Sequence, residues 1–145
     1  MNESLRNIAD GKGAEMASAT GRRQSEAALD QAQRLARLGY YRWSKARQRI
    51  VACNEEYRAI LGMPGAGEEA VQAGVEPLLH PEDRQRVIQD HRNVEASGRS
   101  SQLEFRIIRP DGAVRYLRDY NQPEPNPNGA PETWYGTIQD ITDIR

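Results

Sequence analysis

A strand–turn–strand pattern between Leu103 and Asp119 constrains the fold of this chain more than any other feature of its sequence. Apolar side chains alternate with charged ones from Leu103 to Ile107, and this alternation is typical of a half-buried β-strand. In the turn that follows, residues 110–112 (Pro-Asp-Gly), proline fixes φ, aspartate can bond its own backbone and glycine accepts a positive φ. The pattern therefore predicts an antiparallel hairpin.

Strand and helix patterns alternate along the rest of the chain. Residues 39–44 and 49–53 are predicted to form two strands joined by a short link, and residues 133–141 a last strand. Asn54 is expected to cap one helix, and residues 80–83 (His-Pro-Glu-Asp) to open another. This order is typical of an α+β fold, in which helices pack on one face of an antiparallel sheet.

The chain before the first predicted strand divides into two parts. Residues 1–21 are polar and without periodicity, so we expect a flexible tail. Residues 22–38 predict an amphipathic helix, which Gly39 is expected to end. Its narrow apolar stripe fits equally well against the domain's own sheet or against the same helix of a second chain. The stripe consists of Ala28, Ala32, Leu35 and Ala36.

Composition restricts the classes of partner. The 20 basic and 21 acidic side chains give a formal net charge of −1, so nothing in the overall charge points to nucleic acid or to a membrane surface. No apolar run reaches the roughly 20 residues that span a bilayer. The single cysteine, Cys53, cannot form a disulfide within the chain. We therefore expect a cytoplasmic protein.

Four segments in the same order and spacing resemble the PAS family, and within it the subgroup whose second half carries the PAC motif. The segments are residues 35–43 (LARLGYYRW), 53–62 (CNEEYRAILG), 79–84 (LHPEDR), and 105–118 followed by 135–142. The resemblance implies a PAS domain over residues 39–142. It implies a five-stranded antiparallel sheet in the order 2-1-5-4-3, with helices cupped over one face and the N-terminal amphipathic helix flanking the domain.

The resemblance also implies a function. PAS domains are generally not enzymes. They bind small molecules or cofactors in the cup between sheet and helices, pair with one another, and pass signals to an output domain. We therefore expect a sensory module of a bacterial signalling protein, a homodimer whose output domain or partner is a histidine kinase or a cyclic-nucleotide enzyme. The alternative is a constitutive homodimerisation module with a filled core and no ligand.

The end of the last strand resembles the place where PAS domains hand over to a linking helix. Asp140 and Thr142 would then mark the signal exit, and residues 143–145 the start of the output linker. Enzymatic motifs are missing from the sequence, which contains no glycine-rich phosphate loop, HExxH or GxSxG pattern. We therefore expect no catalytic residues.

Eight side chains are candidates for lining the cup, although aromatic and aliphatic residues at this spacing also fit a plain hydrophobic core. The eight are Tyr41, Trp43, Tyr57, Val87, His91, Phe105, Tyr116 and Ile138. In the second hairpin strand, the alternation places Tyr116 and Arg118 on one face, with Leu117 and Asp119 on the other. We expect Arg118 and its neighbouring arginines to be solvated or paired across strands with Glu104 and Asp119.

The sequence does not identify a cofactor. His91 lies on the apolar face of the predicted central helix, where some family members ligate haem, but a lone histidine fits a core or pocket residue better. His80 and His91 are eleven residues apart across a helix start, which predicts no metal site. The cysteine motif of flavin-binding photoreceptors, Asn-Cys-Arg-Phe-Leu-Gln in kind, is absent, so we do not expect a flavin photoadduct.

Overall fold

The computed structural model describes residues 21, 23–29, 31–32 and 35–144. The predicted tail lies outside these described residues, except for Gly21. The described residues between positions 21 and 36 are helical, as the amphipathic pattern predicts. Contacts within the chain divide it into two units, residues 1–35 and 36–145. Among the helices of the described residues, none is long and apolar enough to cross a membrane.

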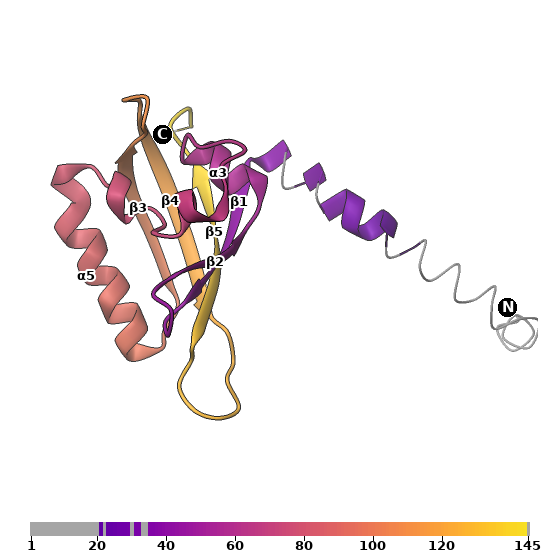
Figure 1. Cartoon of the computed structure of the whole chain (residues 1–145), viewed down its shortest axis with the longest axis vertical. Coiled ribbons are helices and arrows are strands. Elements are labelled where there is room, and N and C mark those ends of the chain that lie inside the picture. The colour runs from indigo at the N-terminus through magenta and orange to yellow at the C-terminus, as the bar shows by residue number, and fades with distance from the viewer. Residues whose placement is uncertain (1–20, 22, 30, 33–34, 145) are drawn as a thin grey trace, which may run out of the picture. The chain divides into compact units, whose positions relative to one another are not determined.

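Five strands form a single antiparallel sheet in the order β2-β1-β5-β4-β3, which confirms the predicted order (Figure 1). The hairpin recognised in the sequence is the pair β3 and β4, and its register joins Phe105 to Leu117. The last strand along the chain, β5, lies at the centre of the sheet between β1 and β4. The strands are β1 (Leu38–Ser44), β2 (Arg49–Cys53), β3 (Ser101–Ile108), β4 (Val114–Pro123) and β5 (Thr133–Asp140).

Helices connect β2 to β3 and pack on one face of the sheet. The longest of them runs beside β3, and the first contacts β1 and β5 (Figure 1). The predicted α+β class is therefore confirmed. The elements are α3 (Glu55–Ile60), α4 (Glu68–Val71), the 3₁₀ turn η1 (Glu76–Leu78) and α5 (Pro81–Ser97).

Asn54 fixes the position of α3 on the sheet. Its Oδ1 accepts hydrogen bonds from the backbone N–H of Tyr57 at 3.0 Å and of Tyr40 at 2.8 Å. The first bond satisfies an N–H group that the helix itself leaves unpaired. The second ties the same side chain to β1. The expected cap at Asn54 is thus confirmed, and it joins the helix to the strand.

The N-terminus of α5 is fixed in a similar way. His80 is the N-cap, and its Nδ1 accepts a hydrogen bond from the backbone N–H of Glu82 at 3.1 Å, as the predicted helix start requires. Asp83 in the first turn accepts hydrogen bonds from the backbone N–H of Arg106 at 2.8 Å and from its Nη2 at 2.9 Å. These hydrogen bonds from Arg106 lower the pKa of Asp83 to about 2. They hold α5 against β3.

Gly39 does not end the N-terminal helix, contrary to the sequence prediction. The helical residues stop at Ala36, Arg37 adopts a left-handed φ of 54°, and β1 already begins at Leu38. Gly39 lies buried in β1, where an added Cβ would stand 2.8 Å from the Cα of Tyr57. Glycine is needed there because α3 approaches the sheet closely.

Candidate ligand-binding site

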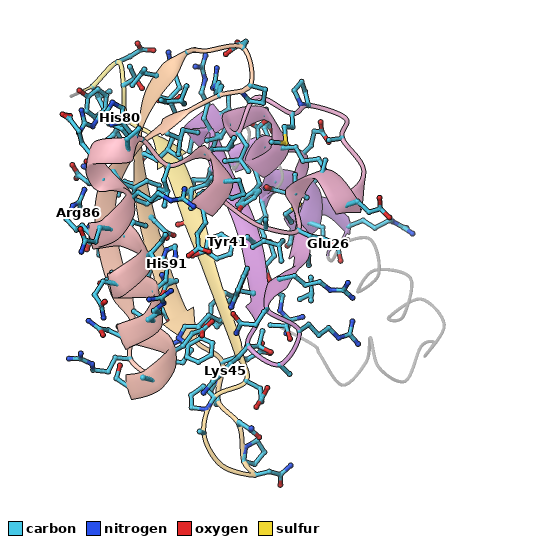
Figure 2. All side chains as sticks on the ribbon, turned by 60° about the vertical axis from the view of Figure 1, so that its left-hand side comes forward. Glu26, Tyr41, Lys45, His80, Arg86 and His91 are labelled. Carbon is cyan, nitrogen blue, oxygen red and sulfur yellow. The ribbon has the colours of Figure 1, made fainter. Side chains whose placement is uncertain are left out.

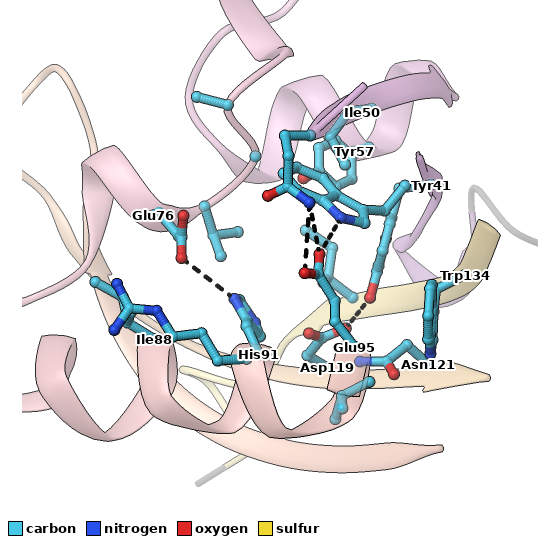
Figure 3. A pocket seen from close by; sticks show the side chains of 18 residues that line it. Tyr41, Ile50, Tyr57, Glu76, Ile88, His91, Glu95, Asp119, Asn121 and Trp134 are labelled. Atoms are coloured by element: carbon cyan, nitrogen blue, oxygen red, sulfur yellow. Dashed lines mark hydrogen bonds and ion pairs between the residues drawn. The ribbon is translucent and has the colours of Figure 1, made fainter. Parts of the chain in front are cut away.

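A cavity of about 280 Å³ lies between the inner face of the sheet and helices α3 and α5 (Figure 3). We call this cavity the cup. Side chains of β1, β2, β4 and β5 form one side of it, and α3, residues 73–76 and α5 form the other. Its volume is near the lower end of the range of about 300–1,000 Å³ that is common for small-molecule sites. The cup therefore suits a small ligand.

Five of the eight predicted lining residues face the cup. They come from β1, α3, α5 and β5, which are brought together only by the fold. Figure 2 shows His80 at the start of α5, and His91 farther along the helix on the side toward Tyr41. The five are Tyr41, Trp43, Tyr57, His91 and Ile138.

The other three predicted residues lie elsewhere. Val87 and Phe105 are buried in the hydrophobic core at 0% and 2% exposure, but they do not line the cup. Tyr116 is half-buried on the opposite face of the sheet, because Leu117 and Asp119 are the β4 residues that point inward. The placement of Tyr116 in the cup was therefore wrong.

Several polar lining residues were missed by sequence reasoning. Asp119 and Asn121 are only 4% and 6% exposed and contribute to the inner face of β4. Glu104 pairs with Arg118 at 3.1 Å as expected, but the expected cross-strand pairing of Asp119 with an arginine was wrong. The signal available in the sequence was the apolar side chain of Leu117, which lies on the same face of β4 as Asp119 and Asn121. Residues missed include Gln48, Glu76, Glu95, Asp119, Asn121 and Trp134.

Asp119 forms the polar end of the cup together with Tyr41. The phenol O–H of Tyr41 donates a hydrogen bond to Oδ1 of Asp119 at 2.7 Å (Figure 3). Burial raises the pKa of Asp119 to about 6, although the hydrogen bond from Tyr41 and the charge of His91 oppose the shift. Burial also raises the pKa of Tyr41 well above its ordinary value, so that this side chain stays a donor. The carboxyl group of Asp119 therefore titrates close to neutral pH.

Asn121 lies two residues farther along the same strand. Its Oδ1 is buried and, among the described residues, has no hydrogen-bond partner. An unpaired buried acceptor costs about 1–3 kcal/mol of stability, so protein interiors rarely retain one. Together with Asp119, Asn121 gives the cup two neighbouring acceptors.

His91 and Glu76 face each other across the cup at a separation of 3.7 Å between Nδ1 and Oε1 (Figure 3). Burial alone would lower the pKa of His91, but the pairing with Glu76 and the negative charges of Asp119 and Asp90 raise it overall. The pairing with His91 in turn lowers the pKa of Glu76. This pair joins α5 to the segment that precedes it.

Glu95 lines the cup from α5, one turn beyond His91. Its Oε1 accepts hydrogen bonds from the indole N–H of Trp43 at 2.7 Å and from Nε2 of Gln48 at 3.3 Å. The carboxylate of Glu95 is thus already engaged by two donors from β1 and the turn after it. Within the described residues, no group of three or more His, Cys, Asp or Glu side chains is arranged to hold a metal ion.

The predicted signal exit at the end of β5 is a compact polar cluster. Oδ2 of Asp140 accepts a hydrogen bond from Nε of Arg115 at 2.7 Å, and Nη2 of Arg109 lies 3.5 Å from the same oxygen. The hydroxyl of Thr142 donates to Oδ1 of Asp140 at 2.6 Å and accepts from the backbone N–H of Tyr116 at 2.9 Å. The chain after β5 is therefore fastened to β4.

Comparison with known proteins gives a family match. Residues 50–138, more than half of the chain, match the family model described as "PAS fold". Protein y4lL of Sinorhizobium fredii, an uncharacterized protein, is 31% identical over 80 residues. That match covers 55% of this chain and 10% of y4lL, so the chain spans only about a tenth of that relative.

Several solved structures have a similar fold. The N-terminal domain of a diguanylate cyclase with PAS/PAC sensor from Marinobacter aquaeolei is 19% identical, with a TM-score of 0.65 over 72% of this chain and 95% of that one. A sensory box histidine kinase/response regulator from Burkholderia thailandensis is 22% identical, with a TM-score of 0.63 over 80% and 86%. A LOV protein of Rhodobacter sphaeroides is 16% identical, with a TM-score of 0.62 over 73% and 60%.

Proposed function

The chain belongs to the PAS fold family, and from this premise we propose that it is a sensory module that binds a small molecule in the cup. The supporting observation is that a cavity of about 280 Å³ is lined by the buried carboxyl group of Asp119 and the buried, unpaired Oδ1 of Asn121. These groups are costly in a core that has only to be filled with apolar side chains. They are useful where a ligand must be oriented.

A chain of contacts supports relay from the cup to the end of β5. Tyr57 of α3 lines the cup, and at the end of the same helix the carbonyl of Ile60 accepts a hydrogen bond from Nε of Arg109 at 3.0 Å. Arg109 in turn pairs with Asp140 at the exit, next to Thr142. If α3 has two positions, a ligand that binds more tightly to one of them would shift α3 toward it. The shift would reach the cluster around Asp140 through Arg109, and its size would be limited by the difference in affinity for the two positions.

The partner that receives the signal is proposed from the neighbours of similar fold. Two of them belong to a diguanylate cyclase and to a histidine kinase/response regulator. We propose that Asp140 and Thr142 lead into an output domain of one of these two classes, a cyclic-nucleotide enzyme or a histidine kinase.

We also propose that the N-terminal helix pairs two copies of the chain. Its stripe residues Ala28, Ala32, Leu35 and Ala36 are exposed, and Leu35 is exposed at 77%. Leu35→Asp should convert dimers into monomers in light scattering while circular dichroism shows the sheet intact. A tenfold change in the dissociation constant of the dimer needs only about 1.4 kcal/mol, so a single charge buried at the interface is sufficient to separate the two copies. Arg23→Asp, on the side of the helix away from the stripe, is the control. Dimers that persist in Leu35→Asp refute this interface.

The ligand itself is tested by denaturing the purified protein and identifying the released small molecules by mass spectrometry and absorbance. We expect one compound to recur at a constant ratio to protein in independent preparations. If repeated preparations release nothing, and an experimental structure shows the cup filled by side chains, the chain is instead a constitutive homodimerisation module. A Soret band in protein supplied with haem would identify haem as the occupant.

A further inference from the structure

We propose that the occupant of the cup is a small organic cation, a protonated amine attached to a flat apolar body. The inference rests on the proposed function, because it names the chemical class that this cavity would bind. Three features of the cup support it: hydrogen-bond acceptors without a cationic partner, the aromatic rings around them, and the balance of charged side chains that face the cavity.

The acceptors lie on the inner face of β4. Asp119 and Asn121 alternate with outward-facing residues, so both point into the cup, and Figure 3 shows them beside each other. Among the described residues, no lysine or arginine forms an ion pair with Asp119, and nothing donates to Oδ1 of Asn121. An ammonium group carries three donors and a positive charge, and it would satisfy both acceptors together.

The other acidic groups of the cup are already engaged. Glu95 accepts from Trp43 and Gln48, and Glu76 faces His91. Their charges nevertheless act on the ligand. Two basic side chains, Arg92 and His91, also line the cup, but the three acidic side chains outnumber them. The cavity therefore repels a carboxylate or phosphate and attracts a cation.

The walls of the cup suit the body of such a ligand. The rings of Tyr41 and Tyr57 lie with their centroids 5.6 Å apart and their planes tilted by 50°. Trp43 and Trp134 line the same cavity, and Ile138 supplies apolar surface. The faces of aromatic rings attract cations within about 6 Å, and they also provide flat contact surface for an apolar group.

Protonation of the cup gives the inference a further consequence. Burial raises the pKa of Asp119 to about 6, and a bound cation would lower it, so binding of an amine should release a proton near that pH. Tyr41 and Asn121 face the carboxyl group from the sheet, Tyr57 acts on it from α3, and His91 and Asp90 act on it from α5. The positive charge that His91 gains on protonation also opposes a bound cation, so both groups weaken binding in acid.

The test is isothermal titration calorimetry of the whole chain at pH 7.5 with 2-phenylethylamine, the neutral 2-phenylethanol and the anionic 3-phenylpropionate. We expect the amine to bind about tenfold or more tightly than the alcohol, and the acid to bind least. Asp119→Asn should weaken amine binding about tenfold or more, and Glu69→Gln, which removes an exposed carboxylate outside the cup, should not. In the unaltered chain, amine affinity should fall by up to about tenfold per pH unit below pH 6.

Several results would overturn the inference. One is that the amine fails to bind, or that the alcohol or the acid binds as tightly as the amine or more tightly. Another is that a folded Asp119→Asn variant binds the amine with unchanged affinity. A third is that the affinity of the unaltered chain for the amine is independent of pH between 4.5 and 7.5. The pH series uses the unaltered chain, so it does not depend on the variant being folded. If the compound released from purified protein is neutral or anionic, this inference fails while the proposed sensory function stands.

Discussion

Replacing Asp119 by asparagine should stabilise the domain at neutral pH, although it removes a charged side chain from the candidate site. Asp119 is 4% exposed, and burial raises its pKa from 3.8 to about 6. A group whose folded-state pKa is raised contributes stability that is fully present below its unfolded pKa of about 4. That stability is lost as the pH rises through about 6. At pH 7.5 the buried carboxylate is ionised in the folded protein and disfavours folding.

The magnitude follows from the shift. A difference of about two pKa units corresponds to about 3 kcal/mol between pH 4 and pH 7.5. Asparagine is neutral throughout this range, and its Oδ1 can still accept the hydrogen bond from Tyr41. We therefore expect Asp119→Asn to raise the free energy of unfolding by about 2–3 kcal/mol at pH 7.5 and by little at pH 4.

Urea unfolding followed by circular dichroism at both pH values measures this difference. Glu69→Gln removes an exposed carboxylate outside the cup and serves as the control, which we expect to be nearly neutral at both pH values. Because His91 also titrates in the cup, the same pair is compared in a His91→Gln background. The reasoning is refuted if Asp119→Asn destabilises the domain at pH 7.5, or if its effect is the same at both pH values.

Two further predictions concern the framework of the cup. Gly39→Ala should lower the free energy of unfolding in urea by about 1–3 kcal/mol, because its Cβ would collide with the backbone of α3. Gly67→Ala serves as the control, because a Cβ added there has no atom within 4 Å, and it should leave the free energy of unfolding nearly unchanged. Equal losses in the two variants would contradict a collision at Gly39. Asp83→Asn should cost about 1–2 kcal/mol at pH 7, allowing for the partly solvated Arg106. Since the folded pKa of Asp83 is depressed, this loss should shrink as the pH falls from about 4 to about 2, and a loss independent of pH would argue against the ion pair.

Local signals in the sequence were sufficient for the framework. Asn54, residues 80–83 and the turn at 110–112 each act through hydrogen bonds to their own or adjacent backbone, so their roles are visible in a few consecutive residues. Strand order came from the resemblance to a family, because neighbours such as β1 and β5 are far apart in the chain.

The cup was harder to predict, because its inner face is partly polar. On β4, alternation suggested that Tyr116 faced inward, yet the inward set contains Leu117, Asp119 and Asn121. A polar inner face reverses the hydrophobic pattern from which strand orientation is predicted. Gly39 posed a similar difficulty. A glycine after an amphipathic helix resembles a helix end, but its role here is set by α3, which follows later in the sequence.

The central claim, that the cup holds a small molecule, is tested most directly by native mass spectrometry of three forms of the chain. Val94 lines the cup from α5, whereas Ala96 on the same helix is exposed and does not. We expect the unaltered chain and Ala96→Trp to retain one small molecule per chain, and Val94→Trp, whose indole would fill the cavity, to carry none. Equal retention by all three forms, or no bound molecule in the unaltered chain, would contradict the claim.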